Sequence, residues 1–198
     1  MKRLFAAVDL PEDVKDELLA MQHGVPGARW VDDDQLHLTL RFIGEVDGAD
    51  ERDIVSALAR VRGAPFTLSL VGAGHFPPRG AARVLWIGVE PSASLDQLQR
   101  SVSGAITRLG HASDRKKWAP HVTLARLDGA PAARVGRFVA ERALYRSRPF
   151  EVDAFHLYAS HLHPKGALYT REDSFPLDGG ALGGWAAEDD DADWGEEE

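Results

Sequence analysis

Apolar and polar positions fall into two recurring patterns along the chain, and each pattern predicts one type of element. Short apolar or alternating runs are typical of strands, whereas residues 94–109 repeat apolar side chains at the spacing of one helix face. Pro11, followed by two acidic residues, is a favourable helix start. We therefore expect strands over 4–10, 37–43, 66–71, 83–89, 121–127, 150–159 and 168–177, helices over 11–24, 50–61, 94–109 and 132–143, and a loop over the glycine- and proline-rich stretch 72–82.

The order of these elements repeats, with strand, helix, strand, helix, strand in each half and one extra strand at the end. His-Leu-Thr-Leu at 37–40 matches His-Val-Thr-Leu at 121–124 with an offset of 84 residues. A duplication explains this match and predicts an α+β fold with two pseudo-twofold-related lobes of antiparallel sheet, helices on the outer faces and an active-site cleft between the lobes. Because each half is small for an independent domain, we expect one bilobal domain over 1–178, with repeat halves of about 1–80 and 81–178.

Composition excludes several classes of protein. The 198 residues include 44% hydrophobic residues and no cysteine, so the chain has no disulfide framework, thiol nucleophile or thiolate metal site. No apolar run reaches the about 18 residues that a membrane-spanning helix requires. The first apolar run ends at Asp9, which is too early for a signal peptide. We expect a soluble cytoplasmic protein without membrane association.

The net charge of −8 is concentrated at one end of the chain. Residues 181–198 carry eight acidic residues and no basic one, which leaves 23 acidic and 23 basic residues in the remainder. The low pI therefore does not argue against an anionic substrate, because the field at a site depends on local charge. The acidic tail, 179–198, is expected to be disordered. It is interpreted as a solvated tail, as a short docking motif, or as an acidic mimic that competes for the basic cleft.

The two matching motifs carry the candidate chemistry. Side chains two positions apart in a strand share one face, so His37 and Thr39 lie together, as do His121 and Thr123. One histidine can accept a proton while the other donates one, and threonine hydroxyls can donate to phosphate oxygens. A single His-x-Thr is often structural, but two copies in register within a repeat favour a catalytic site. This chemistry needs no metal, and the adjacent acidic residues 32–34 are interpreted as a solvated turn.

The segments 37–44 and 121–126 resemble the paired H-x-T-x motifs of the two-histidine phosphoesterases. Within that superfamily the chain is most similar to the bacterial and archaeal RNA 2′,3′-cyclic phosphodiesterases, historically called 2′-5′ RNA ligases. Further similar segments are 4–11, 74–78 with 84–89, and 157–160 with 166–169. The resemblance covers about residues 1–178 and leaves the acidic tail unexplained.

The resemblance implies hydrolysis of a terminal 2′,3′-cyclic phosphate to a 2′-phosphomonoester, without a metal or cofactor. It implies His37 as the proton donor and His121 as the proton acceptor, although the near-symmetric motifs do not themselves make that assignment. The expected substrates are RNA with a 2′,3′-cyclic phosphate end or small cyclic nucleotides. We expect the protein to be a monomer.

Further candidates follow from charge and strand parity. Arg41 shares the face of His37 if its strand is regular, and it is a candidate phosphate or substrate contact. Arg126 matches an arginine of the family, but a bulge or the end of the strand is needed to turn it toward the site. Trp30 and Trp118 are interpreted as packing residues at the edges of the lobes. Strand parity places Phe42 on the apolar face.

Two other functions remain open from the sequence. A ligase that joins 2′,3′-cyclic phosphate and 5′-hydroxyl ends would use the same residues in the reverse reaction. An RNA-end binding module would use the histidines only to recognise phosphate, but two titrating groups in register are more than binding requires. Product analysis separates the first alternative, and a turnover assay separates the second.

Overall fold

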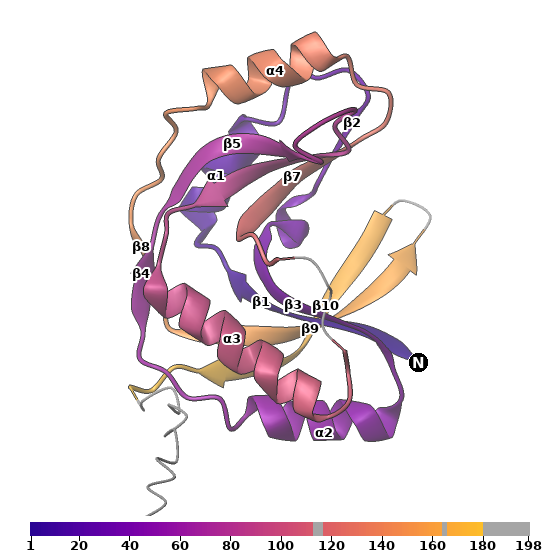
Figure 1. The fold of residues 1–198 in the computed structure, drawn as a ribbon, viewed down its shortest axis with the longest axis vertical. Helices are drawn as coiled ribbons and strands as arrows, with labels where there is room; N and C mark the ends of the chain where they lie inside the picture. The colour runs from indigo at the N-terminus through magenta and orange to yellow at the C-terminus, as the bar shows by residue number, and fades with distance from the viewer. Residues whose placement is uncertain (113–116, 164–165, 180–198) are drawn as a thin grey trace, which may run out of the picture.

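The structure is a computed structural model that describes residues 1–112, 117–163 and 166–179. Beyond Gly179, the expected acidic tail lies outside the described residues. The elements are β1 (Lys2–Asp9), α1 (Glu12–Ala20), β2 (Ala28–Trp30), the 3₁₀ turn η1 (Asp33–Gln35), β3 (His37–Val46), α2 (Gly48–Leu58), β4 (Phe66–Leu68), β5 (Leu70–Phe76), β6 (Val84–Val89), α3 (Ala93–Arg108), β7 (His121–Leu127), α4 (Ala132–Glu141), β8 (Phe150–Val152), β9 (Ala154–His163) and β10 (Gly166–Pro176) (Figure 1).

One large antiparallel sheet connects both lobes. Its strand order is β10-β9-β1-β3-β7-β6-β5, with β2 paired to β7, and β4 and β8 form a separate two-stranded sheet. The expected α+β class with antiparallel sheet is confirmed. Between β3 and β7 the register contains one residue pair, Leu38 with Val122. The two lobes therefore meet edge to edge at this pair.

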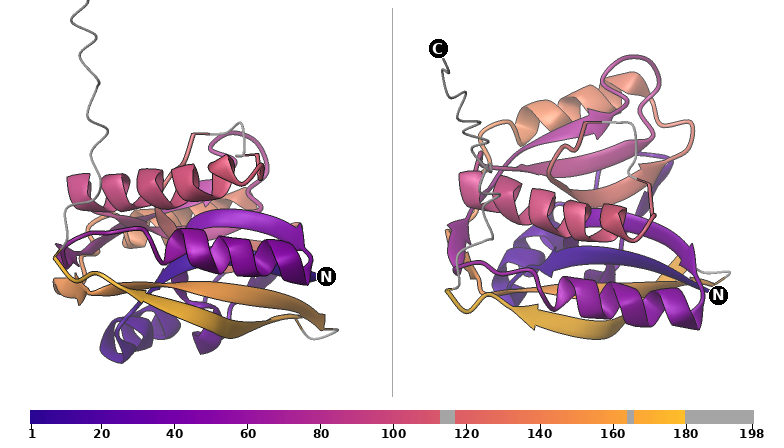
Figure 2. Two further views of the ribbon diagram at one scale, coloured as in Figure 1. Left: turned by 90° about the horizontal axis from the view of Figure 1, so that it is seen from below. Right: turned by 60° about the horizontal axis from the view of Figure 1, so that its bottom comes forward.

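The lobes are not the two halves of the sequence. The C-terminal strand β9 pairs with the N-terminal strand β1, whereas β5 from the first half pairs with β6 from the second. Helix α1 is tied to the segment that follows α4, because Tyr145 donates to Glu17 at 2.7 Å and Arg148 forms an ion pair with Asp13. Helices α2 and α3 lie side by side in the other lobe (Figures 1 and 2). Each half of the chain thus contributes elements to both lobes.

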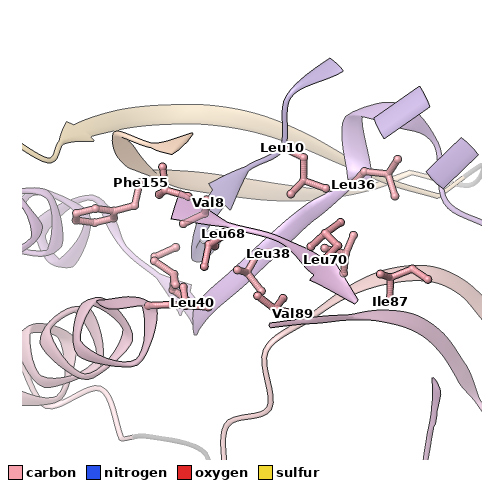
Figure 3. Packing of buried hydrophobic residues seen from close by; sticks show 14 of the residues in the cluster. Val8, Leu10, Leu36, Leu38, Leu40, Leu68, Leu70, Ile87, Val89 and Phe155 are labelled. Carbon is pink, nitrogen blue, oxygen red and sulfur yellow. The ribbon is translucent and has the colours of Figure 1, made fainter. Parts of the chain in front are cut away.

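The core explains why only one face of the motif strands is apolar. Leu38 and Leu40 of β3 are almost fully buried and pack among apolar residues of other strands (Figure 3). Helix α3, which begins at the Ser92 cap, buries one stripe of side chains at helical spacing. That stripe is Leu95, Leu98, Val102, Ala105 and Ile106. Because helices and core cover this side of the sheet, the alternate side chains of β3 are left on the other side.

The expected loop over 72–82 is wrong in its first part, where β5 continues to Phe76. Gly72 has a φ of 59° and occupies a register shift between Val71 and Ala73. A Cβ at Gly74 would lie 2.2 Å from the Trp86 ring. These glycines serve a bulge and a close ring contact within a strand, so their abundance does not mark a loop here.

Two smaller differences concern short elements. The strand expected over 150–159 is divided into β8 and β9, and the edge strand β2 was not expected. None of the described helices combines the length and apolar character needed to cross a membrane.

Candidate active site

The two motifs meet at the centre of the large sheet. Leu38 and Val122, which occupy equivalent positions of the repeat, are antiparallel partners and are both 0% exposed. In an antiparallel pair, the residue before one partner faces the residue after the other. The register therefore sets His37 opposite Thr123 and Thr39 opposite His121. Since all four alternate with buried residues, they share the face of the sheet that the core does not cover.

A bulge follows each motif at the same position. On β1, Ala6 and Ala7 pair with Arg41 and Thr39, so Leu40 is an extra residue in β3. On β6, Leu85 and Trp86 pair with Ala125 and Thr123, so Leu124 is an extra residue in β7. An extra residue reverses the alternation of side chains beyond it. The bulges therefore exchange the faces of the residues that follow each motif.

We expected Arg41 to share the face of His37, but the structure does not place it there. The bulge at Leu40 turns Arg41 to the other face. Its side chain is 7% exposed, and its Nη2 donates to the carbonyl oxygens of His111 and Ala112 at 3.0 and 2.7 Å. These carbonyls follow α3, which packs on the core side of β3. Arg41 therefore ties the end of α3 to the sheet, on the side away from His37.

Phe42 and Arg126 are the residues that the bulges turn toward the motif face. Phe42 is 63% exposed, and its ring lies 5.9 Å from that of Phe5, which stacks on His37 at 4.9 Å. The assignment of Phe42 to the apolar face is thus wrong. Arg126 is exposed. Burial raises the pKa of Tyr169, whose ring lies 5.3 Å from that of His37, and the nearby charge of Arg126 opposes this shift. Arg126 needed a bulge in its strand to face the site, and β7 contains that bulge.

Backbone contacts hold both histidines. Nδ1 of His121 lies 2.7 Å from the carbonyl oxygen of Ala119, and the backbone of Gln35 interacts with the ring of His37. A carbonyl can only accept, so Nδ1 carries the proton in the neutral His121 ring. Nε2 of His121 is then the unprotonated nitrogen. His121 can accept a proton at Nε2, and either histidine can donate a proton when its ring is charged.

The electrostatic environment of His37 favours its neutral form. Burial, with a smaller contribution from the charge of His121, lowers the pKa of His37 to about 4. Asp9 and the Gln35 backbone oppose this shift by stabilising the charged ring. The interaction with His121 also places the two imidazoles within electrostatic range of one another.

Aromatic side chains accompany both histidines, a feature that motif spacing does not predict. The His37 ring lies 6.3 Å from that of Tyr158, and the Phe76 ring meets the edge of His121 at 5.0 Å. Trp86 lies 6.3 Å from His121. These aromatic residues lie in the segments 74–78, 84–89 and 157–160, whose resemblance to the family could have pointed to them.

The tryptophans upstream of the motifs pack as expected. Trp118 donates its indole N–H to the carbonyl oxygen of Thr39 at 3.1 Å, which links the second motif to the first. Trp30 packs against Phe138 with ring centroids 5.7 Å apart. Both tryptophans also pack against the hydrophobic core.

The hydroxyls of the two motif threonines are available to bind a substrate. Within the described part of the chain, no hydrogen bond engages the hydroxyl of Thr39 or Thr123. Two cavities, of about 340 and 480 Å³, are lined by other residues. Across residues 1–112, 117–163 and 166–179, no group of three or more histidine, cysteine or acidic residues has the arrangement of a metal site. The acidic residues 32–34 are exposed at the turn η1.

Comparison with known proteins identifies related chains. A family model described as the 2′-5′ RNA ligase superfamily matches residues 10–164. An Archaeoglobus fulgidus protein named RNA 2′,3′-cyclic phosphodiesterase is 35% identical over 84% of this chain and 96% of its own length. A Geobacillus stearothermophilus protein of the same name is 35% identical over 74% of this chain, and the match spans about half, 53%, of that protein.

A solved structure has the same fold. The crystal structure of TT0787 of Thermus thermophilus superposes with a TM-score of 0.77 and 33% sequence identity. The match covers 90% of this chain and 99% of TT0787. The arrangement of lobes and sheet is therefore shared over nearly the whole of that protein.

Proposed function

Because the chain belongs to the 2′-5′ RNA ligase superfamily, we propose that it hydrolyses the terminal 2′,3′-cyclic phosphate of RNA to a 2′-phosphomonoester. The observation that carries the proposal is the pairing of Leu38 with Val122, since it gathers two histidines and two threonines on one open face. Matching relatives bear the name RNA 2′,3′-cyclic phosphodiesterase, in agreement with this chemistry. Small nucleoside 2′,3′-cyclic phosphates would serve as minimal substrates.

In the proposed reaction, both proton transfers pass through the two histidine rings. His121 takes a proton from water as the water oxygen attacks phosphorus. The bond between phosphorus and the 3′-oxygen then breaks, and His37 gives its proton to that oxygen. The phosphate remains on the 2′-oxygen, and exchange with solvent returns both rings to their starting states. The family resemblance supplies this division of roles.

The other polar groups of the motif face would hold the phosphate. The unengaged hydroxyls of Thr39 and Thr123 can donate to its non-bridging oxygens, and Arg126 adds a positive charge on the same face. Charge-assisted hydrogen bonds of this kind are stronger than neutral ones. The mechanism uses no metal and no cofactor.

Substrate binding would also prepare His37 for its role as proton donor. In the free protein, burial keeps the pKa of His37 low, at about 4. A cyclic phosphate diester is an anion, and an opposite charge beside a histidine favours its protonated form. The donor would therefore become charged in the presence of the substrate that needs it.

Phe42 is the proposed contact for the base of a nucleotide. Its ring is 63% exposed on the motif face, close to the aromatic side chains around His37. Stacking of a base on an aromatic side chain contributes about 1–3 kcal/mol and tolerates different bases. Such a contact would favour RNA ends over inorganic phosphate without selecting a sequence.

The proposal extends to the state in which the protein acts. We propose that residues 1–178 form one phosphoesterase domain that acts as a monomer in the cytoplasm. Its site consists of the six residues of the motif face, which are His37, Thr39, Phe42, His121, Thr123 and Arg126. Size-exclusion chromatography with light scattering on the full chain would test the monomer, and cell fractionation would test the location.

Turnover in the presence of a chelator tests the reaction. The full chain is incubated with adenosine 2′,3′-cyclic phosphate and EDTA, and the products are separated by chromatography against both isomer standards. We expect the 2′-phosphate. Formation of the 3′-phosphate, or a requirement for divalent ions, would contradict the proposal. Binding without turnover would support the RNA-end binding module, and joined strands on addition of 5′-hydroxyl RNA would reveal the ligase reaction.

Single substitutions test the assignment of residues. His37→Ala and His121→Ala should each lower kcat by about 10²–10⁴-fold, the usual contribution of acid–base catalysis. Thr39→Val and Thr123→Val should each cost about 1–3 kcal/mol in kcat/KM through a lost donor to a charged group. His23→Ala, at an exposed position, is the matched control. Near-normal activity of either motif histidine variant would overturn the assignment.

A further inference from the structure

A second concentration of positive charge lies away from the motif face, in a groove between α2 and α3. This groove has a volume of about 480 Å³ and is lined by four arginines, Arg60, Arg62, Arg100 and Arg108. The remaining lining residues are small or uncharged, and no acidic residue is among them. Helices α2 and α3 lie together on one side of the sheet (Figure 2). The lining of the groove includes no residue of the two histidine motifs.

The arginines of the groove lack acidic partners within the described part of the chain. No carboxylate there forms an ion pair with any of the four, and all four are exposed. Arg62 instead donates to the carbonyl oxygens of Ala59 and Val61 at 2.6 and 3.5 Å. Clustered like charges without ion-pair partners create a local potential that attracts anions.

The described chain ends beside this groove. The N–H of Gly179 donates to the carbonyl oxygen of Gly63 at 3.0 Å. A smaller cavity, of about 340 Å³, is lined by both Asp178 and Arg62, and Arg62 also lines the larger groove. The described chain therefore ends near Arg62, one of the four arginines.

The sequence beyond that point has the complementary charge. The eight acidic residues of 181–198 all fall within 188–198, and no basic residue accompanies them. Nine residue steps separate Gly179 from Glu188. A random coil of that length would span about 15–18 Å on average, and the fully extended length is about 30 Å. A ligand on so short a tether has an effective concentration on the order of millimolar.

We propose that the acidic segment 188–198 binds the arginine groove between α2 and α3 of its own chain. The segment supplies carboxylates, which are absent from the lining of the groove, and its tether begins near Arg62. The bound segment would shield these arginines from other polyanions while the motif face stays open. This proposal does not depend on the catalytic activity of the motif face.

Paramagnetic relaxation in the full chain tests the contact directly. Because the chain has no cysteine, Ala192→Cys provides a single site for a nitroxide label and keeps all eight acids. At low salt, we expect at least twofold loss of amide signal intensity for residues 57–62 and 97–108. The signals should recover near 1 M salt, where the screening length falls to about 3 Å. Intensity loss centred on 37–42 and 121–126, or no selective loss, would overturn the proposal.

Charge variants of the labelled chain identify the groove as the cause. Arg100→Glu with Arg108→Glu should abolish the selective signal loss, and Arg100→Gln with Arg108→Gln should weaken it. Arg79→Glu with Arg134→Glu makes the same charge change in the other lobe and should leave the signal loss intact. Amide spectra of the reduced label verify the fold of each variant. Unchanged signal loss in both groove variants would show that the segment binds elsewhere.

Discussion

His37 and His121 have equivalent places in the repeat and different surroundings in the folded chain. The His37 ring stacks on Phe5 and meets the edge of Tyr169, and this burial lowers its pKa to about 4. The His121 ring instead makes a T-shaped contact with Phe76. Two residues that look alike in the sequence are therefore distinguished by their neighbours, a difference that a division of acid and base roles requires.

The lowered pKa of His37 predicts how stability depends on pH. The unfolded chain binds a proton at this position below about pH 6.5, whereas the folded chain does so only near pH 4. The free energy of unfolding should therefore fall as the pH drops from 6.5 to 4 because the unfolded state takes up the proton. In urea titrations at pH 7, 5.5 and 4.5, His37→Asn should lose less stability than the unsubstituted chain. His23→Asn is the exposed control, and equal pH dependence in the unsubstituted and His37→Asn chains would refute the shift.

Arg41 and Arg126 should have opposite effects on activity and stability. Arg126→Ala removes a charge from the motif face and should raise KM for a dinucleotide 2′,3′-cyclic phosphate by roughly tenfold, the equivalent of about 1.4 kcal/mol. Arg41→Ala removes two hydrogen bonds to carbonyls and should lower the free energy of unfolding by about 1–3 kcal/mol with little change in KM. Steady-state kinetics and urea unfolding of both variants separate these effects. The reverse pattern would show that the bulges do not set these faces.

At the scale of the strand, two bulges and one glycine build the motif face. Leu40 and Leu124 are extra residues that turn Phe42 and Arg126 over. Gly74 gives space to the Trp86 ring, which in turn packs against neighbouring aromatic side chains. These irregularities convert two similar strands into one site with an aromatic residue on one side and an arginine on the other.

A methyl group at Gly74 should displace Trp86 and disturb His121 through it. The added Cβ would lie 2.2 Å from the indole, whose centroid is 6.3 Å from that of His121. Gly74→Ala should lower the free energy of unfolding by about 1–3 kcal/mol, as overpacking does, and should reduce kcat/KM. Gly136→Ala in α4 meets open space and should be neutral or stabilising by up to about 1 kcal/mol. Equal unfolding midpoints in urea for both variants would contradict this account.

At the scale of the whole molecule, the exchange of elements makes each lobe depend on both halves of the chain. The C-terminal strand β9 completes the sheet beside β1, and β5 completes it beside β6. Neither half retains a full lobe when separated from the other. The junction at Leu38 and Val122 is fully buried, so the lobes also share one core.

This interdependence predicts a single cooperative unfolding transition. Far-UV circular dichroism and tryptophan fluorescence should report the same urea midpoint, because no lobe can unfold while leaving the other intact. Leu38→Ala at the junction should cost about 2–5 kcal/mol and shift both probes together. Two separated transitions, or a shift in one probe alone, would mean that the lobes fold independently.

Sequence alone was sufficient for the features that depend on local periodicity. The offset between 37–40 and 121–124 predicted the repeat and singled out the four polar motif residues. The resemblance of these motifs to a known family named the superfamily that the comparisons confirm. The main helices and strands followed from apolar spacing, with differences chiefly at glycine-rich β5. These predictions succeed because side-chain alternation within a regular strand is a property of the strand itself.

Tertiary structure decided the features that depend on pairing between distant segments. Pairing of β3 with β1 produces the bulge that exchanges the faces of Arg41 and Phe42. The order in which the strands pair in the sheet determines which strands each lobe contains. The environment of His37 depends on aromatic rings from several strands, which spacing within one motif does not encode. Such features arise because register, strand order and burial are determined by contacts across the sheet, whereas the order of residues specifies only which side chains are available to make them.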